Sequence, residues 1–451
     1  MKIPISKFNL LLSSNSRTSI VKKNVLGSFV VKGISILISL VLVPLTIGYV
    51  SNELYGIWLT LSTIVSWTTL FDFGFGNGLR NKVTECIALK DWTRARQYIS
   101  TAYFYFIVVF IPISIVLWFI CGEVNWAYLL SVENSYQHLM VAVIRIVLVF
   151  FSVTMIAKII NTVLAALQMN AVANMIDMLG QLLVLIMTYV LTFTTEASLL
   201  LLAIVISVCP LLVYVIYSIW FYTRKYKNLS PTYKLIKKSM IKDVLNLGLK
   251  FFVMQLSVII MYQTMNIIIS HVSGPESVTE FNVVYKYLSL PLLAVTIIIQ
   301  PLWSACTDAY TLKDYVWMQN IYKKIKILFA IVLVVMLLLI ILYPLFFKIW
   351  IGDKVDIHVS MVLSCALYMT IIIWNSIHSA LINGFGKITL MLYGALLSMI
   401  IDIPLAYVLG LCYGAQGVVL AVTILMLPGI IINPIQVNKI ISNTARGIWN
   451  K

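Results

Sequence analysis

Charged side chains interrupt several long apolar runs of the chain, and they are the residues whose types could do chemistry. At the centre of a bilayer a charged side chain costs about 2.5–3.5 kcal/mol, so it normally faces water or a partner group. Five of these residues are basic and two are acidic: Lys32, Arg145, Lys158, Lys250, Lys286, Asp177 and Asp402. The positive excess favours an anionic ligand.

The elements that carry these charges must be membrane-spanning helices. The 451 residues are 61% hydrophobic and 11% charged, a composition that excludes a water-soluble globular protein of this size. A bilayer core of about 30 Å needs roughly 20 apolar residues per helix. Twelve runs satisfy this length: 25–49, 54–72, 98–120, 139–166, 171–193, 197–222, 244–270, 281–303, 322–347, 358–382, 388–411 and 415–438. The sequence therefore predicts an all-α polytopic membrane protein with about twelve transmembrane helices.

The basic residues of the loops predict the orientation of these spans. If the N-terminus is inside, nearly all loop Lys and Arg residues are cytoplasmic, and Lys348 and Lys354 fall outside. We therefore expect cytoplasmic N- and C-termini, and a first span that is retained rather than cleaved as a signal peptide. Most of the net charge of +16 is then a signature of topology, and nucleic acid is not an expected partner.

The stretch "FDFGFGNGLRNKVTEC", Phe71 to Cys86, suggests a phosphate-binding loop at first sight. It does not match GxGxxG, and it follows an apolar run of helical length instead of a short strand. We expect that Gly74, Gly76 and Gly78 end the second span and let the chain turn into a short interfacial segment. Arg80 and Lys82 are predicted to face anionic headgroups there.

An internal repeat divides the chain into two halves of six spans. The motif "YVL" occurs at 189–191 and again at 407–409, and "LKDW" at 89–92 returns as "LKDY" at 312–315 with nearly the same spacing. An even number of spans per half predicts two parallel lobes related by a pseudo-twofold axis along the membrane normal. The predicted domains are 1–222, a basic cytoplasmic linker 223–243 and 244–451. The linker's cations and tyrosines could bind RNA, but an anionic leaflet is the expected neighbour.

Two of the cations within the predicted spans are repeat equivalents. Lys32 and Lys250 are separated by the same spacing as the two "YVL" motifs, and so are Ser39 and Ser257. We predict that the two lysines face each other across the cleft between the lobes and bind an anionic group. The alternative is that both snorkel to the cytoplasmic interface. Arg145 and Lys286, each near the outer end of its span, are predicted to receive the anion on the outer side.

The acidic pair is not related by the repeat, because Asp177 corresponds to Ala395 and Asp402 to Val184. Each carboxylate could be a hydrogen-bonded structural group at a helix contact. Each could also couple transport to an ion or a proton.

Several motifs resemble one known family. "ELYGIW" at 53–58, "FDFGFGNG" at 71–78 and "NGFGK" at 383–387, with two parallel six-span halves, resemble the polysaccharide (Wzx-type, O-antigen) flippases of the multidrug/oligosaccharidyl-lipid/polysaccharide (MOP) exporter superfamily. The turn before the fifth span, "LQMN", lacks the glycine and lysine of "NGFGK". The resemblance implies a MATE/MOP-like fold and translocation of an undecaprenyl-diphosphate-linked oligosaccharide across a bacterial plasma membrane by alternating access.

Two other functions stay open at this point. A cation-coupled multidrug antiporter of the same superfamily would depend on intramembrane carboxylates, of which Asp177 and Asp402 are present. A polysaccharide polymerase or glycosyltransferase would need a catalytic external loop, and the longest one expected, 121–138, has no organised motif. The six cysteines and four histidines are isolated, so no metal site, cofactor or enzymatic activity is predicted. Expected partners are the lipid-linked substrate, membrane lipids and polysaccharide-assembly proteins.

Overall fold

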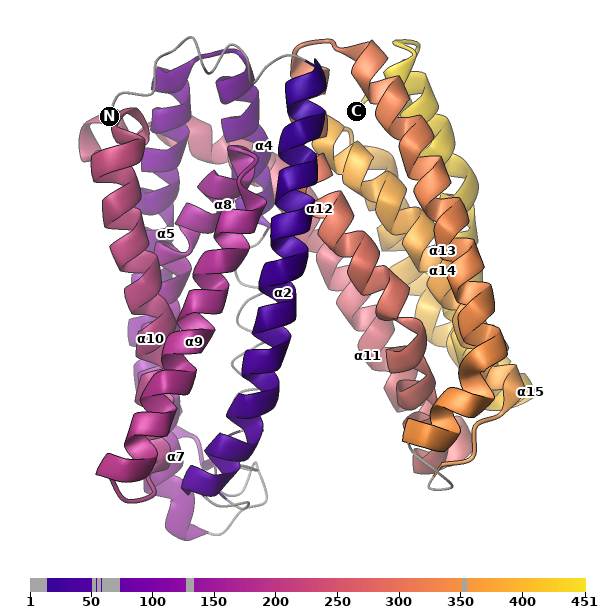
Figure 1. Ribbon diagram of the computed structural model, residues 1–451, viewed down its shortest axis with the longest axis horizontal. Coiled ribbons are helices and arrows are strands. Elements are labelled where there is room, and N and C mark those ends of the chain that lie inside the picture. The colour runs from indigo at the N-terminus through magenta and orange to yellow at the C-terminus, as the bar shows by residue number, and fades with distance from the viewer. Residues whose placement is uncertain (1–13, 51–53, 55–57, 59–73, 127–133, 351–354) are drawn as a thin grey trace. The chain divides into compact units, whose positions relative to one another are not determined.

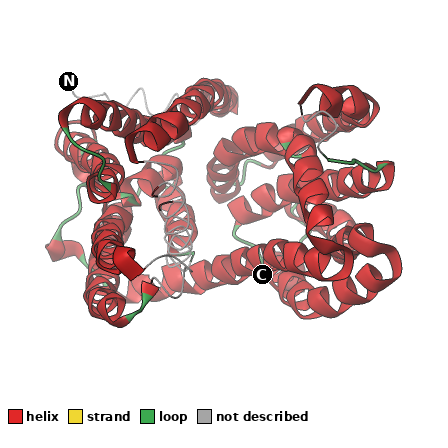
Figure 2. Ribbon diagram, turned by 90° about the horizontal axis from the view of Figure 1, so that it is seen from below, coloured by secondary structure: helices red, strands yellow, loops and turns green. Residues whose placement is uncertain are grey.

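The computed structural model describes residues 14–50, 54, 58, 74–126, 134–350 and 355–451. Every regular element in this part of the chain is helical, and no strand occurs in it (Figure 2). Ten of the described helical segments are long and apolar enough to cross a membrane. The predicted all-α class with about twelve spans is confirmed. The predicted span 54–72 lies almost entirely outside the described residues.

The chain divides into two compact units, Met1–Gly248 and Leu249–Lys451. The first unit contains these helices (Figure 1): α2 (Ser14–Val50), α4 (Phe75–Ala88), α5 (Trp92–Glu123), η2 (Asn134–Tyr136), α7 (Gln137–Ala157), α8 (Ile159–Ala166), α9 (Asn170–Thr194), α10 (Leu199–Trp220), η3 (Phe221–Lys225), η4 (Lys227–Leu229) and η5 (Tyr233–Leu235). Within it, α9 packs along both α2 and α10, and α7 packs between α5 and α10.

The second unit begins inside a helix. It contains most of α11 (Lys238–Leu288), then α12 (Leu290–Thr311), α13 (Tyr315–Trp350), α14 (Val359–Phe385), α15 (Thr389–Ile441) and η7 (Gly447–Asn450). α11 and α15 are each broken by a glycine with positive φ, Gly274 (φ 83) and Gly414 (φ 64). Each of these long elements is therefore two helices joined by a sharp turn, and Gly414 separates the two predicted spans 388–411 and 415–438.

The repeat found in the sequence recurs in the local backbone. Before α5, Lys90 has φ 61 and Asp91 caps the helix by accepting a hydrogen bond from Arg94 N at 2.9 Å. Before α13, Lys313 has φ 57 and Asp314 accepts from Trp317 N at 3.1 Å. A carboxylate at this position satisfies one of the orphan N–H groups of a helix start. The "LKD" motif therefore forms the same turn, with the same helix cap, in both halves of the chain.

The predicted linker 223–243 is attached to the first unit. Thr232 N and Lys237 N donate to the hydroxyls of Ser100 and Thr101 on α5, at 3.0 and 3.1 Å. Arg96 Nε donates to Ser230 O at 2.6 Å. The linker therefore lies against the start of α5.

The glycine-rich stretch begins a buried helix. Gly74 has φ 67 and precedes α4, and a Cβ on Gly78 would lie 2.5 Å from Val244 O. α4 can therefore approach the first turns of α11 only because Gly78 has no side chain. Arg80 is 7% exposed, so the prediction that it faces headgroups is wrong. Burial lowers the pKa of Arg80 to about 9, which leaves the side chain cationic at neutral pH.

Candidate functional site

Lys32 projects from α2 as an exposed side chain. It lies midway between Ser14 and Val50, the two ends of the helix. No hydrogen bond or ion pair to it occurs among the residues that the structure describes. Because its predicted span begins at residue 25, Lys32 lies about eight residues, roughly 12 Å, inside the span. A cation there is costly unless water or an anion reaches it, and Lys32 is one of the candidate cations of the first unit that the described residues leave without a partner.

Lys250, the repeat equivalent, is held by a neighbour. Its Nζ donates to Thr389 Oγ1 at 2.9 Å, from α11 to the first residue of α15. Ser257, two turns further along α11, is buried and donates to Val253 O and Ala395 O. Its equivalent Ser39 is exposed and bonds Ser35 O within its own helix. The two halves thus place the same residue types in different surroundings.

Arg145 on α7 is fixed against α5. Its Nε donates to Trp118 O at 3.1 Å, and its guanidinium lies over the Trp118 ring, 5.1 Å from the centroid. A Cβ on Gly122 would collide with the guanidinium, so the glycine makes room for it. Arg145 therefore already has a structural role, since a hydrogen bond and a cation–π contact both order it.

Lys286 and Lys158 are exposed. Neither has a hydrogen-bond or ion-pair partner among the described residues. Within the described part of each unit, the structure brings no two of the basic candidates into contact, so each lies separately on its own helix.

Asp177 on α9 is a satisfied carboxylate. Its Oδ1 accepts from Asn161 Nδ2 on α8 at 2.7 Å and from Tyr214 OH on α10 at 2.6 Å. One carboxylate therefore connects three helices of the first unit, which is the geometry of a structural group.

Asp402 on α15 has different surroundings. It is 1% exposed, and Oδ2 accepts a hydrogen bond from Thr264 Oγ1 on α11 at 3.0 Å. Oδ1 is buried and has no partner among the described residues. A buried carboxylate oxygen without a donor is costly while the group is ionised. A proton or a cation at Oδ1 would remove that cost.

The surroundings of one buried histidine were not predicted from the sequence. His378 on α14 is fully buried; Tyr322 OH lies 3.2 Å from its Nε2, and Trp374 O lies 2.8 Å from Nδ1. It follows Trp374 by one helical turn, a spacing that carries no sequence signal by itself. No group of three His, Cys, Asp or Glu side chains able to hold a metal occurs in the described part of the chain.

The fold defines the class of the protein. The chain resembles a solved structure described as the outward-facing conformation of a multidrug resistance MATE family transporter of the MOP superfamily, with TM-score 0.76 and 16% identity over 95% of this chain and 97% of that one. A solved structure of a MOP superfamily transporter from Pyrococcus furiosus, described as having a binding pocket of reverse polarity, matches with TM-score 0.75 and 14% identity over 94% of this chain and 96% of that one. The protein therefore has the same fold as these transporters, as predicted.

The sequence defines the family within that class. Residues 21–305 match the model of the family described as "Polysaccharide biosynthesis protein", and the chain belongs to this family. It is 24% identical to a putative O-antigen transporter of Salmonella typhi over 274 residues, which are 60% of this chain and 61% of the relative. A putative O-antigen transporter of Salmonella typhimurium is 25% identical over 58% and 59%. The match spans about three-fifths of the length of these relatives.

Proposed function

We propose that the protein is a flippase, which moves an undecaprenyl-diphosphate-linked oligosaccharide across the plasma membrane of a bacterium by alternating access. The observation that carries this proposal is Lys32, an exposed cation about eight residues inside its predicted span, without a partner among the described residues. The diphosphate of such a lipid is an anion that has to cross an apolar core, and a lysine at that depth supplies charge-assisted hydrogen bonds on the way. Membership of the polysaccharide biosynthesis family supports the same substrate class.

The cations take different parts in this proposal. Lys32 and Lys250 bind the diphosphate from the two halves of the chain, and Lys250 exchanges its bond to Thr389 for the phosphate. Lys286 receives the anion on the outer side. Arg145 contributes least, because leaving Trp118 would cost it a hydrogen bond and a cation–π contact.

Ion coupling, if transport uses it, is assigned to Asp402 rather than Asp177. Oδ1 of Asp402 has no partner among the described residues, whereas Oδ1 of Asp177 accepts hydrogen bonds from two donors. Membrane potential contributes in addition: with the inside negative, outward passage of one negative charge is favoured by about 2.3 kcal/mol per 100 mV.

Location and partners follow from the same proposal. The protein is a multi-pass component of the bacterial plasma membrane with both termini in the cytoplasm, and it works beside the enzymes that polymerise the exported glycan. It has no catalytic role of its own and needs no cofactor.

The test is reconstitution of the purified chain in proteoliposomes that contain a fluorescent undecaprenyl-diphosphate oligosaccharide. A flippase exposes the glycan of the inner leaflet to an external glycosidase without lengthening it. Extrusion of cationic dyes in place of glycan exposure would identify a drug antiporter. Glycan chains longer than the input would identify a polymerase, and either result would overturn the proposal.

A further inference from the structure

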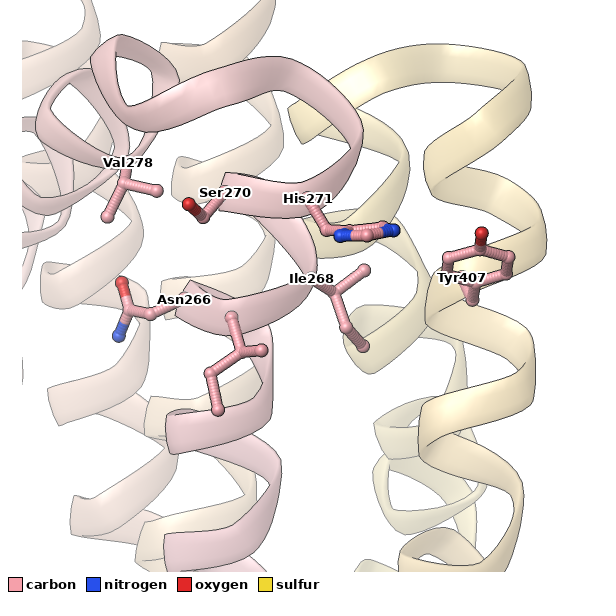
Figure 3. A pocket seen from close by; sticks show the side chains of 7 residues that line it. Asn266, Ile268, Ser270, His271, Val278 and Tyr407 are labelled. Carbon is pink, nitrogen blue, oxygen red and sulfur yellow. The ribbon is translucent and has the colours of Figure 1, made fainter.

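A pocket of about 740 Å³ lies where the first half of α11 ends, close to Gly274. Residues from α11 form most of its lining, and Tyr407 of α15 closes one side (Figure 3). This volume is within the usual range of small-molecule sites, about 300–1,000 Å³. The pocket belongs wholly to the second unit, and no part of the proposed diphosphate site lies in it.

The lining of the pocket includes several polar side chains whose hydrogen-bonding capacity is unused. Asn266 Oδ1 accepts from Asn282 Nδ2 at 2.9 Å, and Nδ2 of Asn266 has no acceptor in the described part of the chain. Ser270 and His271 are exposed, and Tyr407 is 41% exposed. Their side-chain polar atoms have no hydrogen-bond partner among the described residues. Figure 3 shows two groups of these side chains: Asn266 and Ser270 lie on one side of α11, and His271 lies on the other side beside Tyr407. Each group can offer donors and acceptors to a ligand.

The depth of these groups makes a lipid neighbour unfavourable. Asn266 lies eight residues before Gly274, so it is about 12 Å along the helix from the turn. Hydrocarbon cannot hydrogen-bond an amide, and burying one without a partner costs free energy. The apolar side chains of Ile268 and Val278 line the same pocket, as is usual in sites for organic ligands.

The character of the lining selects a ligand class. The described lining residues include no carboxylate, lysine or arginine, so a diphosphate or a metal ion has no counter-charge there. Rings of His271 and Tyr407 lie with centroids 6.2 Å apart and planes at 36°, and Figure 3 shows both side chains at the same level of the pocket. Amide, hydroxyl and imidazole groups beside aromatic faces suit a neutral molecule rich in hydroxyls that also has apolar C–H faces.

We propose that this pocket is a carbohydrate subsite, which binds neutral sugar residues of the transported oligosaccharide. This inference rests on the proposed flippase function and adds to it a place where the glycan, rather than the diphosphate, is recognised. Because the pocket lies near Gly274, at the predicted outer end of the span, it would hold the sugars while the diphosphate is still deeper in the protein.

The experiment measures binding of three probes to the purified chain in lipid nanodiscs. The probes are the undecaprenyl-diphosphate oligosaccharide extracted from the native host, undecaprenyl diphosphate without sugar, and the free oligosaccharide released from the lipid. The variant is the double substitution His271→Ala and Tyr407→Ala, with Tyr407→Phe as a milder change that keeps the ring. The matched control is Tyr189→Ala, because Tyr189 is the repeat equivalent of Tyr407 and is 56% exposed on the first unit.

We expect the wild-type chain to bind the glycan-bearing lipid about tenfold more tightly than the bare lipid, the scale of two hydrogen bonds. The double variant should lose this difference without losing affinity for the bare lipid, and Tyr189→Ala should keep it. An equal preference in the double variant and the wild type would overturn the subsite, as would equal binding of both lipids by the wild type.

Failure of the flippase proposal gives a different pattern. If the wild type bound neither lipid, the diphosphate site would be refuted. Binding of the free oligosaccharide by the wild type, lost in the double variant, would then still support the pocket, and absence of that binding would refute it too.

Discussion

The two carboxylates inside the membrane show how differently the two units use one residue type. In the first unit, Asp177 receives two hydrogen bonds on one oxygen and connects α8, α9 and α10. In the second unit, Asp402 is more deeply buried, receives one bond from Thr264, and keeps an oxygen without a donor among the described residues. Asp177 is therefore built to hold helices together. Asp402 has the surroundings of a group whose protonation or ion binding can change.

The repeat-equivalent lysines show the opposite division. Lys32 of the first unit has no partner among the described residues, whereas Lys250 of the second unit is bonded to Thr389. For this pair of lysines the first unit leaves the cation unengaged and the second unit engages it, whereas for the carboxylates the first unit satisfies the group and the second does not. Equivalent positions in a repeat do not imply equivalent chemistry.

The largest effect is expected from removing the unengaged cation. Lys32→Met should lower glycan export about tenfold to a hundredfold, since a hydrogen bond to a charged group contributes about 1.5–3 kcal/mol. Lys250→Met should lower it less, because part of that interaction is already made with Thr389. Export is measured as surface glycan in cells that depend on this protein, at matched protein levels.

Arginine variants at both positions serve as the control for charge. Lys32→Arg should retain most export if charge is the requirement. Wild-type export by the Lys32→Met, Lys250→Met double variant would remove both lysines from the substrate site, and a larger loss at Lys250 would reverse the assigned order.

Substitution of the two carboxylates should affect the ion dependence of transport differently. Asp402→Asn should abolish any dependence of flipping on pH or sodium, because the amide can neither ionise nor supply a charge to a cation. Asp177→Asn should leave that dependence unchanged. The measurement is the initial flipping rate in proteoliposomes with imposed proton or sodium gradients, and an unchanged gradient dependence in Asp402→Asn would exclude coupling through this residue.

The free energy of unfolding should depend more on Asp177 than on Asp402. Asp177→Ala leaves Asn161 and Tyr214 without their acceptor, so we expect a loss of about 2 kcal/mol and a lower melting temperature. Asp402→Ala should be close to neutral, because Thr264 Oγ1 also bonds Ile260 O at 2.8 Å. Thermal unfolding followed by size-exclusion fluorescence compares the two, and an equal loss in both would contradict the structural assignment of Asp177.

A smaller effect is expected from releasing the engaged lysine. Thr389→Val removes the acceptor of Lys250 Nζ while keeping the shape of the side chain. Export should change by about threefold or less, because one net hydrogen bond contributes about 0.5–1.5 kcal/mol and a mobile lysine makes the weaker kind. In the Lys32→Met background the same substitution should partly restore export, because it makes Lys250 resemble the lost cation. No restoration there would show that the bond to Thr389 does not limit Lys250.

The smallest effect on the protein is expected from chemical labelling of an exposed cysteine. The cysteines of the first unit are all buried, and in the second unit Cys306 and Cys365 are buried while Cys412 is exposed beside the Gly414 turn. Burial also raises the pKa of Cys86 to about 12, so its thiolate is scarce at neutral pH. A membrane-impermeant maleimide added to intact cells should therefore label Cys412. Cys412→Ser should abolish the label, and labelling only after the cells are opened would reverse the proposed orientation.

Hydropathy and repeats predicted the class of the fold because both can be recognised from short stretches of sequence without knowledge of their packing partners. A long apolar run, about 20 residues, needs no partner to be recognised, and the "LKD" turn is formed by residues next to each other in the chain. The turn before α9 is a further local case. The sequence showed that "LQMN" lacks the glycine and lysine of "NGFGK", yet Gln168 has φ 58 where Gly386 has φ 70. The conformation persisted without the glycine, because the flanking helices hold it.

The surroundings of the candidate site could not be predicted in this way. Thr389 is 139 residues from Lys250, and Thr264 is 138 residues from Asp402. Nothing in either segment marks the other as its neighbour. The burial of Arg80 was missed for the same reason, since α4 looks amphipathic and basic until its packing is known.

The contact between α4 and α11 has a consequence for synthesis of the chain. The carbonyl of Val244 lies against Gly78, and Gly248 packs against Gly74 and Phe75, so the first unit includes the opening turns of a helix that belongs otherwise to the second. A nascent chain that has reached the end of the sixth span still lacks this piece. The first unit can complete its packing only after Gly248 has left the ribosome, when synthesis of the second half has already begun.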